Sequence, residues 1–367
     1  MSFLSILLPV YNQIELVKKN VEIILKSKRH DIELVVCDDC SSENIESFFK
    51  AIDDSRVTYY RNEVNLGHDY NILKGLEKAK SDYVFLLRTR DLILVEAIDL
   101  IISTITLNPD IAYLTGSAID ENGNNKLIFN EKIYKCGIET LRANRMLFIH
   151  PSGQLYNKRY IDFNALELFL NNHLHSKYGF VVHNLIRTQL ALKGDFIILS
   201  DFLWQYTNTS KCKDIAVNSA PDKMSVYSYE YEVLRFSLEF DWVNLVFPET
   251  YKELQFEFLL QDYLKRATWG IIQHNNNKEE LAHYDSESKN LKFSQLQQDF
   301  TVFAYQKIGC ITSPIKENLE KKIKIFILNN NINNRLKYYI YNYLVRITGI
   351  EEFVLMLKNR YNQLCIK

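Results

Sequence analysis

The chain has 367 residues, which is enough for two domains or for one domain with a large appendage. Its 44 basic and 45 acidic residues leave a formal net charge of −1, whereas dedicated nucleic-acid-binding proteins usually carry a basic excess. Apolar residues make up 47% and can form a packed core, but no run approaches the roughly 20 apolar residues of a membrane-spanning helix. We therefore expect a globular protein that does not bind nucleic acid.

The first part of the chain alternates apolar runs with helical patterns. Strands are predicted over 3–8, 32–37, 56–62 and 82–87, and helices over 14–27, 44–52 and 71–80. This alternation predicts an α/β fold for residues 1–107, with βαβ units and a mostly parallel sheet flanked by helices. We expect the first strand to stop at Pro9.

The rest of the chain is less regular and then becomes helical. Gly123-Asn124 predicts a hairpin turn, and the pattern from residue 183 predicts a helix ended by Gly194 and followed by a strand. Long helical patterns follow over 231–240, 251–272 and 335–347. We therefore predict an α/β domain over 1–215 and a helical C-terminal region over 216–367.

Cysteine usage and the N-terminus indicate the compartment. Cys37 and Cys40 form a C-x-x-C pair, but no second pair completes a zinc site, and the other four cysteines are scattered. The apolar start of the chain lacks a basic n-region and a cleavage site. Both features predict a cytoplasmic protein, at most peripheral at the inner face of the membrane.

Polar residues follow the predicted strands at the edge where open α/β sheets bind ligands. They comprise Pro9-Val10-Tyr11-Asn12, Asp38-Asp39-Cys40-Ser41-Ser42, Asn65-Leu66-Gly67-His68-Asp69-Tyr70-Asn71 and Arg88-Thr89-Arg90-Asp91. Because side chains alternate along a strand, we expect Arg88 and Arg90 to project on the same side.

In its first 110 residues or so, this ordered set resembles the family 2 inverting nucleotide-sugar glycosyltransferases, which have the GT-A fold. The resemblance implies a nucleotide-binding half over 1–107 and an acceptor half over 108–215. It also implies transfer of a sugar, with inversion, from a nucleotide-sugar donor, UDP-linked by expectation, to a carbohydrate or lipid-linked glycan acceptor. The expected product class is a bacterial capsule or other cell-surface polysaccharide.

The resemblance also assigns roles in donor binding. Tyr11 would stack on the nucleobase, Asp39 would accept a hydrogen bond from the imide N–H of the base, and Asp38 would brace the turn. Tyr11 could instead serve only in packing, and Asp38 only as a helix N-cap. The remaining donor-side residues implied are Pro9, Val10, Asn12, Asn65, Gly67, His68, Asn71 and Asp91.

The fourth motif departs from the family pattern, whose aspartates normally hold a divalent metal across the donor diphosphate. Arg88 and Arg90 stand at two of its positions. In one interpretation they replace the metal as permanent cations beneath the diphosphate, so that no metal is required. In a second, Asp91 alone still holds manganese or magnesium. In a third, the site has decayed and the arginines pair with nearby carboxylates.

The family's general base is an aspartate that opens a helix ending in Lys-Gly. Counting back from Lys193-Gly194 places His183 there, and a neutral imidazole can accept the acceptor's proton. The alternative is that His183 is an ordinary core or surface histidine. Asp195 and Asp201 are weaker candidates, and His150 and Ser152 fall where the family builds its acceptor wall.

Two further alternatives remain open. The protein could be a catalytically silent nucleotide-binding or assembly subunit, since metal and base aspartates are both replaced. The helical tail from residue 315 onward mixes basic, tyrosine and apolar residues. It could form an interfacial surface for a membrane or lipid-linked acceptor, an oligomer contact, or a subdomain packed on the sheet.

Overall fold

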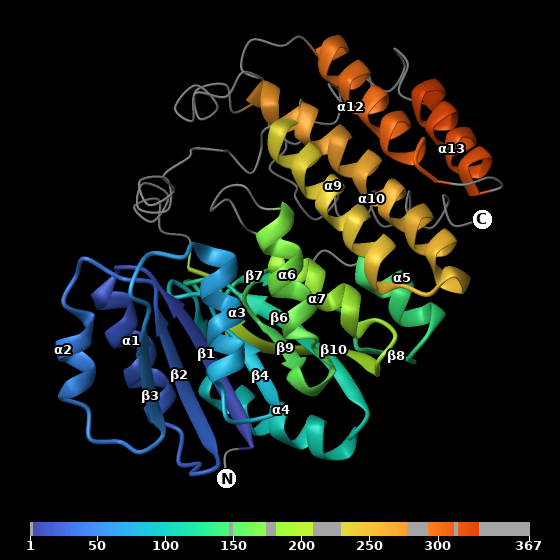
Figure 1. The fold of residues 1–367 in the computed structure, drawn as a ribbon. Helices are drawn as coiled ribbons and strands as arrows, with labels where there is room; N and C mark the ends of the chain where they lie inside the picture. Colours follow the sequence, from blue (N-terminus) through green and yellow to red (C-terminus); the bar gives the residue numbers. More distant parts are fainter. Residues whose placement is uncertain are drawn as a thin grey trace. The chain divides into compact units, whose positions relative to one another are not determined.

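The computed structural model describes residues 3–146, 150–173, 181–207, 229–276, 293–311 and 315–329. The chain divides into two compact units, Met1–Leu296 and Gln297–Lys367. The first unit holds the whole sheet and its surrounding helices (Figure 1). The boundary predicted between residues 215 and 216 and the helical pattern over 335–347 lie outside the described residues.

The first part of the chain, up to residue 107, forms the parallel side of the sheet, as predicted. Its strands pair in the order β3-β2-β1-β4. Their bounds are β1 (Leu4–Val10), β2 (Ile32–Asp38), β3 (Val57–Arg61) and β4 (Tyr83–Leu86). The expected stop at Pro9 is wrong, because β1 continues to Val10 and Pro9 pairs with Cys37 of β2. Pairing with β4 has already ended at Leu7, so the missing N–H of Pro9 interrupts no bond there.

The second half of the sheet is joined through one antiparallel strand. Here β9 (Gln154–Asn157) lies between β4 and β6 (Ile111–Ile119) and pairs antiparallel with both. Strand β10 (Asp195–Gln205) runs parallel to β6, and β5 (Leu92–Ile93) closes this edge. The predicted hairpin is confirmed by β7 (Asn125–Leu127), which pairs with β6 beyond Gly123 at φ +79°. A short β8 (Lys132–Tyr134) pairs with β10.

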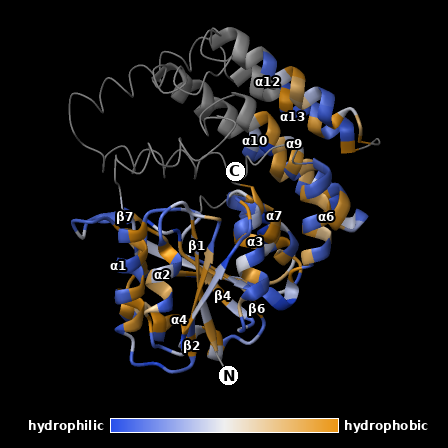
Figure 2. Cartoon of the chain, turned by 60° about the vertical axis from the view of Figure 1, so that its left-hand side comes forward, coloured by the Kyte–Doolittle hydropathy of each residue, from blue (hydrophilic) through white to orange (hydrophobic). Residues whose placement is uncertain are grey.

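Helices cover both faces of the sheet. Apolar side chains from α1 (Ile14–Leu25), α2 (Ile45–Lys50) and α4 (Val95–Leu107) share one core with alternate residues of β1 and β2. The other face carries α3 (His68–Lys78) on β1 and β2, with α7 (Val182–Leu190) against β6 and α3. Gly75 lets α3 approach closely, since a Cβ there would lie 2.4 Å from Leu7. Figure 2 shows the resulting concentration of apolar colour on the strands between these helices.

Further helices extend the first unit beyond the sheet. They are η1 (Lys158–Tyr160), α5 (Ile138–Met146), α6 (Phe163–His173), α9 (Tyr229–Val246) and α10 (Glu249–Asn276). The patterns predicted over 231–240 and 251–272 are thus confirmed as helices α9 and α10, which pack on each other and on α7 and α5. Buried Trp242 of α9 donates its indole N–H to the carbonyl of Leu185 in α7.

The second unit contains most of α12 (Phe293–Ile308) and all of α13 (Ile315–Asn329). The helical character predicted for the start of the tail is confirmed by α13. None of the helices in the described ranges combines the length and the apolar character that crossing a bilayer requires.

Candidate functional site

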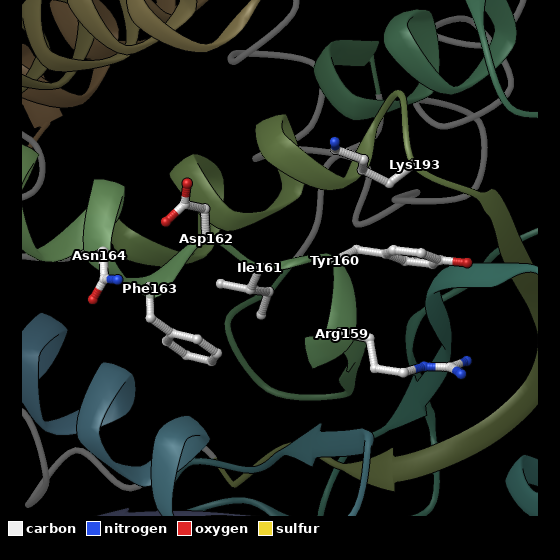
Figure 3. A pocket seen from close by; sticks show the side chains of 7 residues that line it. All are labelled: Arg159, Tyr160, Ile161, Asp162, Phe163, Asn164 and Lys193. Carbon is white, nitrogen blue, oxygen red and sulfur yellow. The ribbon is translucent and has the colours of Figure 1, made fainter.

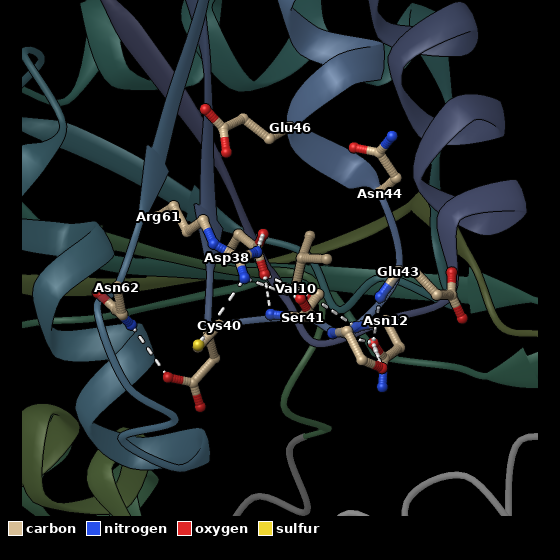
Figure 4. Close-up of polar contacts among 12 residues, drawn as sticks. Val10, Asn12, Asp38, Cys40, Ser41, Glu43, Asn44, Glu46, Arg61 and Asn62 are labelled. Atoms are coloured by element: carbon tan, nitrogen blue, oxygen red, sulfur yellow. Dashed lines mark hydrogen bonds and ion pairs between the residues drawn. The ribbon is translucent and has the colours of Figure 1, made fainter.

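The turns after β1 and β2 hold each other (Figure 4). Asn12 lies in the left-handed region at φ 57°, and its side-chain oxygen accepts hydrogen bonds from the backbone N–H groups of Ser42 and Glu43. In return the hydroxyl of Ser41 accepts from the backbone N–H of Asn12 at 2.7 Å. Asn12, a predicted donor-site residue, therefore links the turn that precedes α1 to the turn that precedes α2.

Asp38 braces the β2 turn from inside. It is fully buried, and one carboxylate oxygen accepts from the backbone N–H and hydroxyl of Ser41. The other oxygen accepts from the Tyr59 hydroxyl at 2.6 Å and from Arg61 at 2.8 Å. Four protein donors surround this carboxylate, as expected of a bracing residue.

Asp39 reaches across to the loop before α3. Its carboxylate is 3% exposed and accepts from the backbone N–H groups of Leu66 at 2.7 Å and Gly67 at 2.8 Å. The side-chain amide of Asn62 donates to it as well. Gly67 has φ +85°, which favours glycine, and its N–H also approaches the side chain of Asn65. The structure thus joins the second and third predicted motifs through one carboxylate.

The predicted donor side also includes Asn71, Val10 and Tyr11. Asn71 is buried and donates to the carbonyl of Cys37 at 2.9 Å, so it ties α3 to β2. Val10 points its side chain into the core, and its carbonyl accepts the N–H of Asp39. Tyr11 is partly exposed and makes no hydrogen bond or ring contact with the described residues. Its ring thus has no protein partner there and could serve as a stacking surface.

The Arg-Thr-Arg-Asp motif forms a turn rather than the end of a strand. Strand β4 ends at Leu86, and the N–H of Asp91 donates to the carbonyl of Arg88. Thr89 anchors the turn by donating its hydroxyl to the carbonyl of Pro9 at 2.8 Å. Strand alternation was therefore the wrong basis for placing Arg88 and Arg90, because the chain leaves the extended conformation before it reaches them.

Arg88 and Asp91 lie in one closed cluster. Asp91 is fully buried, and one of its oxygens accepts from the Arg88 guanidinium at 3.2 Å and from the Ser152 hydroxyl at 2.5 Å. Its other oxygen accepts from the backbone N–H of Thr207. Ser152 also accepts from the backbone N–H of Arg88. The predicted acceptor-side Ser152 is thus brought against the diphosphate motif.

His150 joins the same cluster through Arg88. Its Nε2 lies 2.7 Å from an Arg88 nitrogen, and its ring stacks on Trp204 at 4.7 Å and meets the edge of Tyr206. Burial, followed by the charges of Arg88 and Arg90, lowers the pKa of His150 to about 2. The ring is therefore neutral at physiological pH and can accept from the Arg88 guanidinium.

Arg90 differs from Arg88. Its Nε is buried without a hydrogen-bond partner, and within the described residues no carboxylate pairs with it. Burial lowers the pKa of Arg88 to about 10, while Asp91 opposes this fall, so Arg88 keeps its charge inside the cluster. Of the two arginines, Arg90 is the one whose charge is not neutralised by a protein partner in the described part of the chain.

A divalent metal, which the resemblance implies, does not fit the residues at this position. Magnesium and manganese prefer several oxygen ligands, and Asp91 is the motif's one carboxylate. Each of its oxygens already accepts hydrogen bonds, and two guanidinium groups stand within three residues of it. Among the described residues no group of three or more histidine, cysteine, aspartate or glutamate side chains is arranged to hold a metal ion.

His183 lies in the first turn of α7 and is 6% exposed. Its Nδ1 has no hydrogen-bond partner in the described part of the chain. Burial lowers the pKa of His183 to about 3, although the charge of Asp69 opposes this fall. A proton on His183 would further lower the pKa of His150, so the predicted base and the predicted acceptor-side histidine interact electrostatically.

Several residues at this edge had not been singled out from the sequence. Trp204 and Tyr206 form the aromatic wall around His150, and Asp69 of α3 bonds both His68 and the start of α7. Asp69 stood inside a quoted motif, so its place in a polar run before a helix was the available signal.

Asp195 begins β10 at the opposite edge and pairs with Lys135, so it lies apart from the site. Asp201 is exposed in a bulged part of β10.

An open hollow occurs elsewhere on the first unit. Figure 3 shows its lining residues, which are Arg159, Tyr160, Ile161, Asp162, Phe163, Asn164 and Lys193. It follows the end of β9, where Asn157 pairs with Tyr83 at the amino end of β4. The hollow is therefore at the opposite edge of the sheet from the turns described above.

Comparisons with known proteins identify a family match and similar sequences. Residues 5–163 match the model of glycosyl transferase family 2. A Campylobacter jejuni GalNAc(5)-diNAcBac-PP-undecaprenol beta-1,3-glucosyltransferase is 26% identical over 210 residues, which cover 53% of this chain and 67% of that protein. An Escherichia coli UDP-Glc:alpha-D-GlcNAc-diphosphoundecaprenol beta-1,3-glucosyltransferase, WfgD, is 27% identical over 37% of this chain and 57% of its own length.

The fold also has a counterpart among solved structures. S. aureus TarS 1–349 in complex with UDP-GlcNAc superposes with a TM-score of 0.58 at 14% identity, covering 85% of this chain and 82% of that one. This likeness shows the GT-A fold. The match over residues 5–163 assigns this part of the chain to glycosyl transferase family 2, the inverting nucleotide-sugar glycosyltransferases.

Proposed function

We propose that the protein transfers a sugar from a UDP-linked donor to a lipid-linked glycan with inversion, in the synthesis of a bacterial surface polysaccharide. The observation that carries this proposal is the gathering of Tyr11, Asp39 and the Arg88–Asp91 turn at the carboxyl ends of β1, β2 and β4. UDP stands in the names of WfgD and of the TarS complex, and undecaprenol-linked glycans in those of the two relatives. An acceptor of that kind would be met at the inner face of a membrane.

In the proposed donor complex the base stacks on Tyr11 and donates its imide N–H to Asp39. Asp39 is suited to this because backbone N–H groups of Leu66 and Gly67 already orient its carboxylate. Asp38, Asn12, Asn65 and Asn71 act through the turn geometry, and His68 stands at the start of α3 beside the same loop. On the donor side, these polar side chains therefore act by fixing the backbone of the turns that would surround the nucleotide.

In the transfer step the acceptor hydroxyl attacks the anomeric carbon while the bond to the diphosphate oxygen breaks. His183 takes the hydroxyl proton, and the nucleoside diphosphate departs with the electron pair of the broken bond. Arg90 carries the charge that stabilises this leaving group, because within the described residues its guanidinium has no carboxylate partner. Arg88 is bound to Asp91 and His150 and holds the turn in place.

This division of roles makes the proposed reaction independent of a divalent metal. It rests on the chemistry of the donor set, in which one hydrogen-bonded carboxylate stands beside two guanidinium groups. Arginine retains its charge across the physiological range and binds phosphate oxygens directly. His150 and Ser152, which support Arg88 and Asp91, then form the border between the diphosphate and the acceptor side.

The test uses the full chain with UDP-glucose or UDP-N-acetylglucosamine and an undecaprenol-diphosphate-linked acceptor. We expect UDP to raise the melting temperature equally in EDTA and in manganese, and transfer to proceed in EDTA. R90A should lower kcat by about 100-fold or more with UDP affinity reduced less, and H183A should lower kcat with UDP affinity unchanged.

Two outcomes would overturn parts of this proposal. Transfer that requires manganese would contradict the arginine assignment. UDP binding without turnover on any donor and acceptor of these classes would favour the catalytically silent subunit, for which the absence of a carboxylate at the His183 position is the supporting observation.

A further inference from the structure

Helix α7 carries the proposed base but has no cap of its own. The residue before it, Val181, offers no side-chain hydrogen bond to the first turn, and the first turn holds no acidic residue. The leading N–H groups of a helix need a partner, and a negative charge near them is favourable. For α7 this partner comes from another helix that is distant in sequence.

Asp69 of α3 supplies it. One carboxylate oxygen of Asp69 accepts from the backbone N–H of Val181 at 3.0 Å and of Val182 at 3.2 Å. Its other oxygen lies 3.0 Å from Nδ1 of His68. Asp69 is 2% exposed, so this carboxylate is buried and its hydrogen bonds are made inside the protein. His183 is the next residue along the chain after Val182.

The start of α3, which carries Asp69, is also held by the loop that precedes it. Gly67 precedes α3 and donates its N–H to Asp39, the proposed base-recognition residue. Asp39, Gly67, Asp69 and Val182 thus form a continuous series of hydrogen bonds and short chain segments. It runs from the nucleobase side of the site to the residue next to His183.

We propose that Asp69 is a positioning residue that fixes the amino end of α7, and with it His183, to the donor-binding loop. The inference rests on the proposed function for the role of His183, but the hold of Asp69 on α7 does not. The series of contacts places the proton acceptor at a set position relative to the bound donor. Misplacement of a catalytic group by about 1 Å can lower a rate by about 100-fold.

The experiment compares D69A, D69N, H183A and D69A/H183A in the full chain. The asparagine side chain in D69N keeps one oxygen for the two N–H groups, so this variant should stay within about fivefold of wild-type kcat, whereas D69A should lose about 10- to 100-fold. The double variant should be no slower than H183A, because both changes act on one step. UDP affinity should change by less than about threefold throughout.

A second readout is independent of activity. Amide hydrogen exchange over residues 181–190 should become at least about tenfold faster in D69A, with exchange over β1 and β2 unchanged. D162A is the matched control, since Asp162 caps α6 by accepting from the N–H of Ala165 at 2.9 Å and has no part in the site. If D69A does not fold, D69S takes its place in both measurements.

The outcomes separate the two proposals. The positioning role would be overturned if amide exchange over α7 in D69A stayed at the wild-type rate. It would also be overturned if the losses of kcat in D69A and H183A multiplied in the double variant. If H183A transferred sugar at the wild-type rate, the assignment of His183 as the general base would be wrong. Faster exchange of α7 in D69A would in that case still support the hold of Asp69 on this helix.

Discussion

The proposed donor half (residues 1–107) and the proposed acceptor half (residues 108–215) differ in how their described polar side chains are paired. In the donor half, Asp38, Asp39 and Asn12 each accept several hydrogen bonds from neighbouring turns. In the acceptor half, buried polar atoms lack a partner among the described residues. They are the hydroxyls of Tyr156 and Thr207, Nδ1 of His183, Nε and Nη1 of Arg187, and Nε1 of Trp204.

The difference separates a preformed region from one that retains hydrogen-bonding capacity. A buried donor or acceptor without a partner costs about 1–3 kcal/mol of stability. The acceptor half carries several such groups around α7 and β10, so its arrangement is not the one that stability alone would select. Within the donor half, Arg90 also has a buried nitrogen without a partner among the described residues, and Arg90 is the residue to which we assign the leaving group.

The largest effect is expected for D39A. The substitution removes the proposed partner of the nucleobase, leaves the N–H of Leu66 without its acceptor, and leaves the N–H of Gly67 with Asn65 alone. Hydrogen bonds to a charged group are worth about 1.5–3 kcal/mol each, so UDP affinity should fall by at least about 100-fold. Isothermal titration calorimetry measures this, with D53A on the exposed surface as control. Retained affinity would mean that the donor half is not preformed around Asp39.

The next contrast lies between the two arginines. R88A leaves Asp91 buried without its cation and should lower the free energy of unfolding by about 3 kcal/mol. R90A removes a side chain with no ion pair among the described residues, so stability should change by less than about 0.5 kcal/mol while transfer is lost. Urea denaturation beside the transfer assay measures both. Equal destabilisation by the two variants would contradict the separate roles.

A third prediction concerns acid. Burial holds the pKa of His183 near 3 and of His150 near 2, below the ordinary value of 6.5 that applies in the unfolded chain. The unfolded chain therefore takes up protons as the pH falls below about 6.5 and the folded chain does not, so stability declines from pH 6.5 down to about 3. Each histidine contributes up to about 1.4 kcal/mol per pH unit.

The variants H183Q and H150Q isolate this contribution. The groups whose charges act on His183 are Asp69, Arg187, His68 and Glu239, and all remain in H183Q. Urea denaturation at pH 7, 6 and 5 should show a shallower decline for either variant than for wild type. An unchanged slope would mean that the histidine is solvated or paired, and the acceptor half would then resemble the donor half.

The smallest effect is expected for two neighbouring tyrosines. Tyr113 and Tyr156 are both fully buried on paired strands, but Tyr113 donates its hydroxyl to Gln154 whereas the Tyr156 hydroxyl has no partner in the described residues. Y156F should be neutral or stabilising by about 1 kcal/mol, and Y113F destabilising by about 1 kcal/mol. Thermal unfolding distinguishes the two variants. If both substitutions changed the stability in the same direction, the proposed difference between the two hydroxyls would be wrong.

Local patterns predicted the donor half well. The strands and helices up to residue 107 follow from apolar runs and helical spacing, and parallel strands bring their ends together at one edge. This places Tyr11, Asp39 and the arginine turn close to one another without further information. The family resemblance then supplies the roles, because hydrogen-bonding potential alone does not identify a nucleotide.

The remainder depends on contacts between distant segments. The four residues of β9 show no period that marks an antiparallel strand between β4 and β6. The turn at Arg88 is fixed by two hydrogen bonds of Thr89, one with Asn20 of α1 and one with Pro9 of β1. Asp69 meets Val181 across 112 residues, and His150 is neutral because of burial. None of these effects is encoded in a local pattern.

Strand β9 has a consequence for biosynthesis. Among the described strands it alone links β4 to β6, so β1 to β4 emerge from the ribosome with one edge uncovered until Asn157 has been made. An uncovered edge strand is a template for pairing with other chains. The turn that carries Arg88 and Asp91 is held by Ser152, two residues before β9, so this turn gains that contact at about the point of synthesis where β4 gains its partner strand. A nascent chain interrupted before that point has neither.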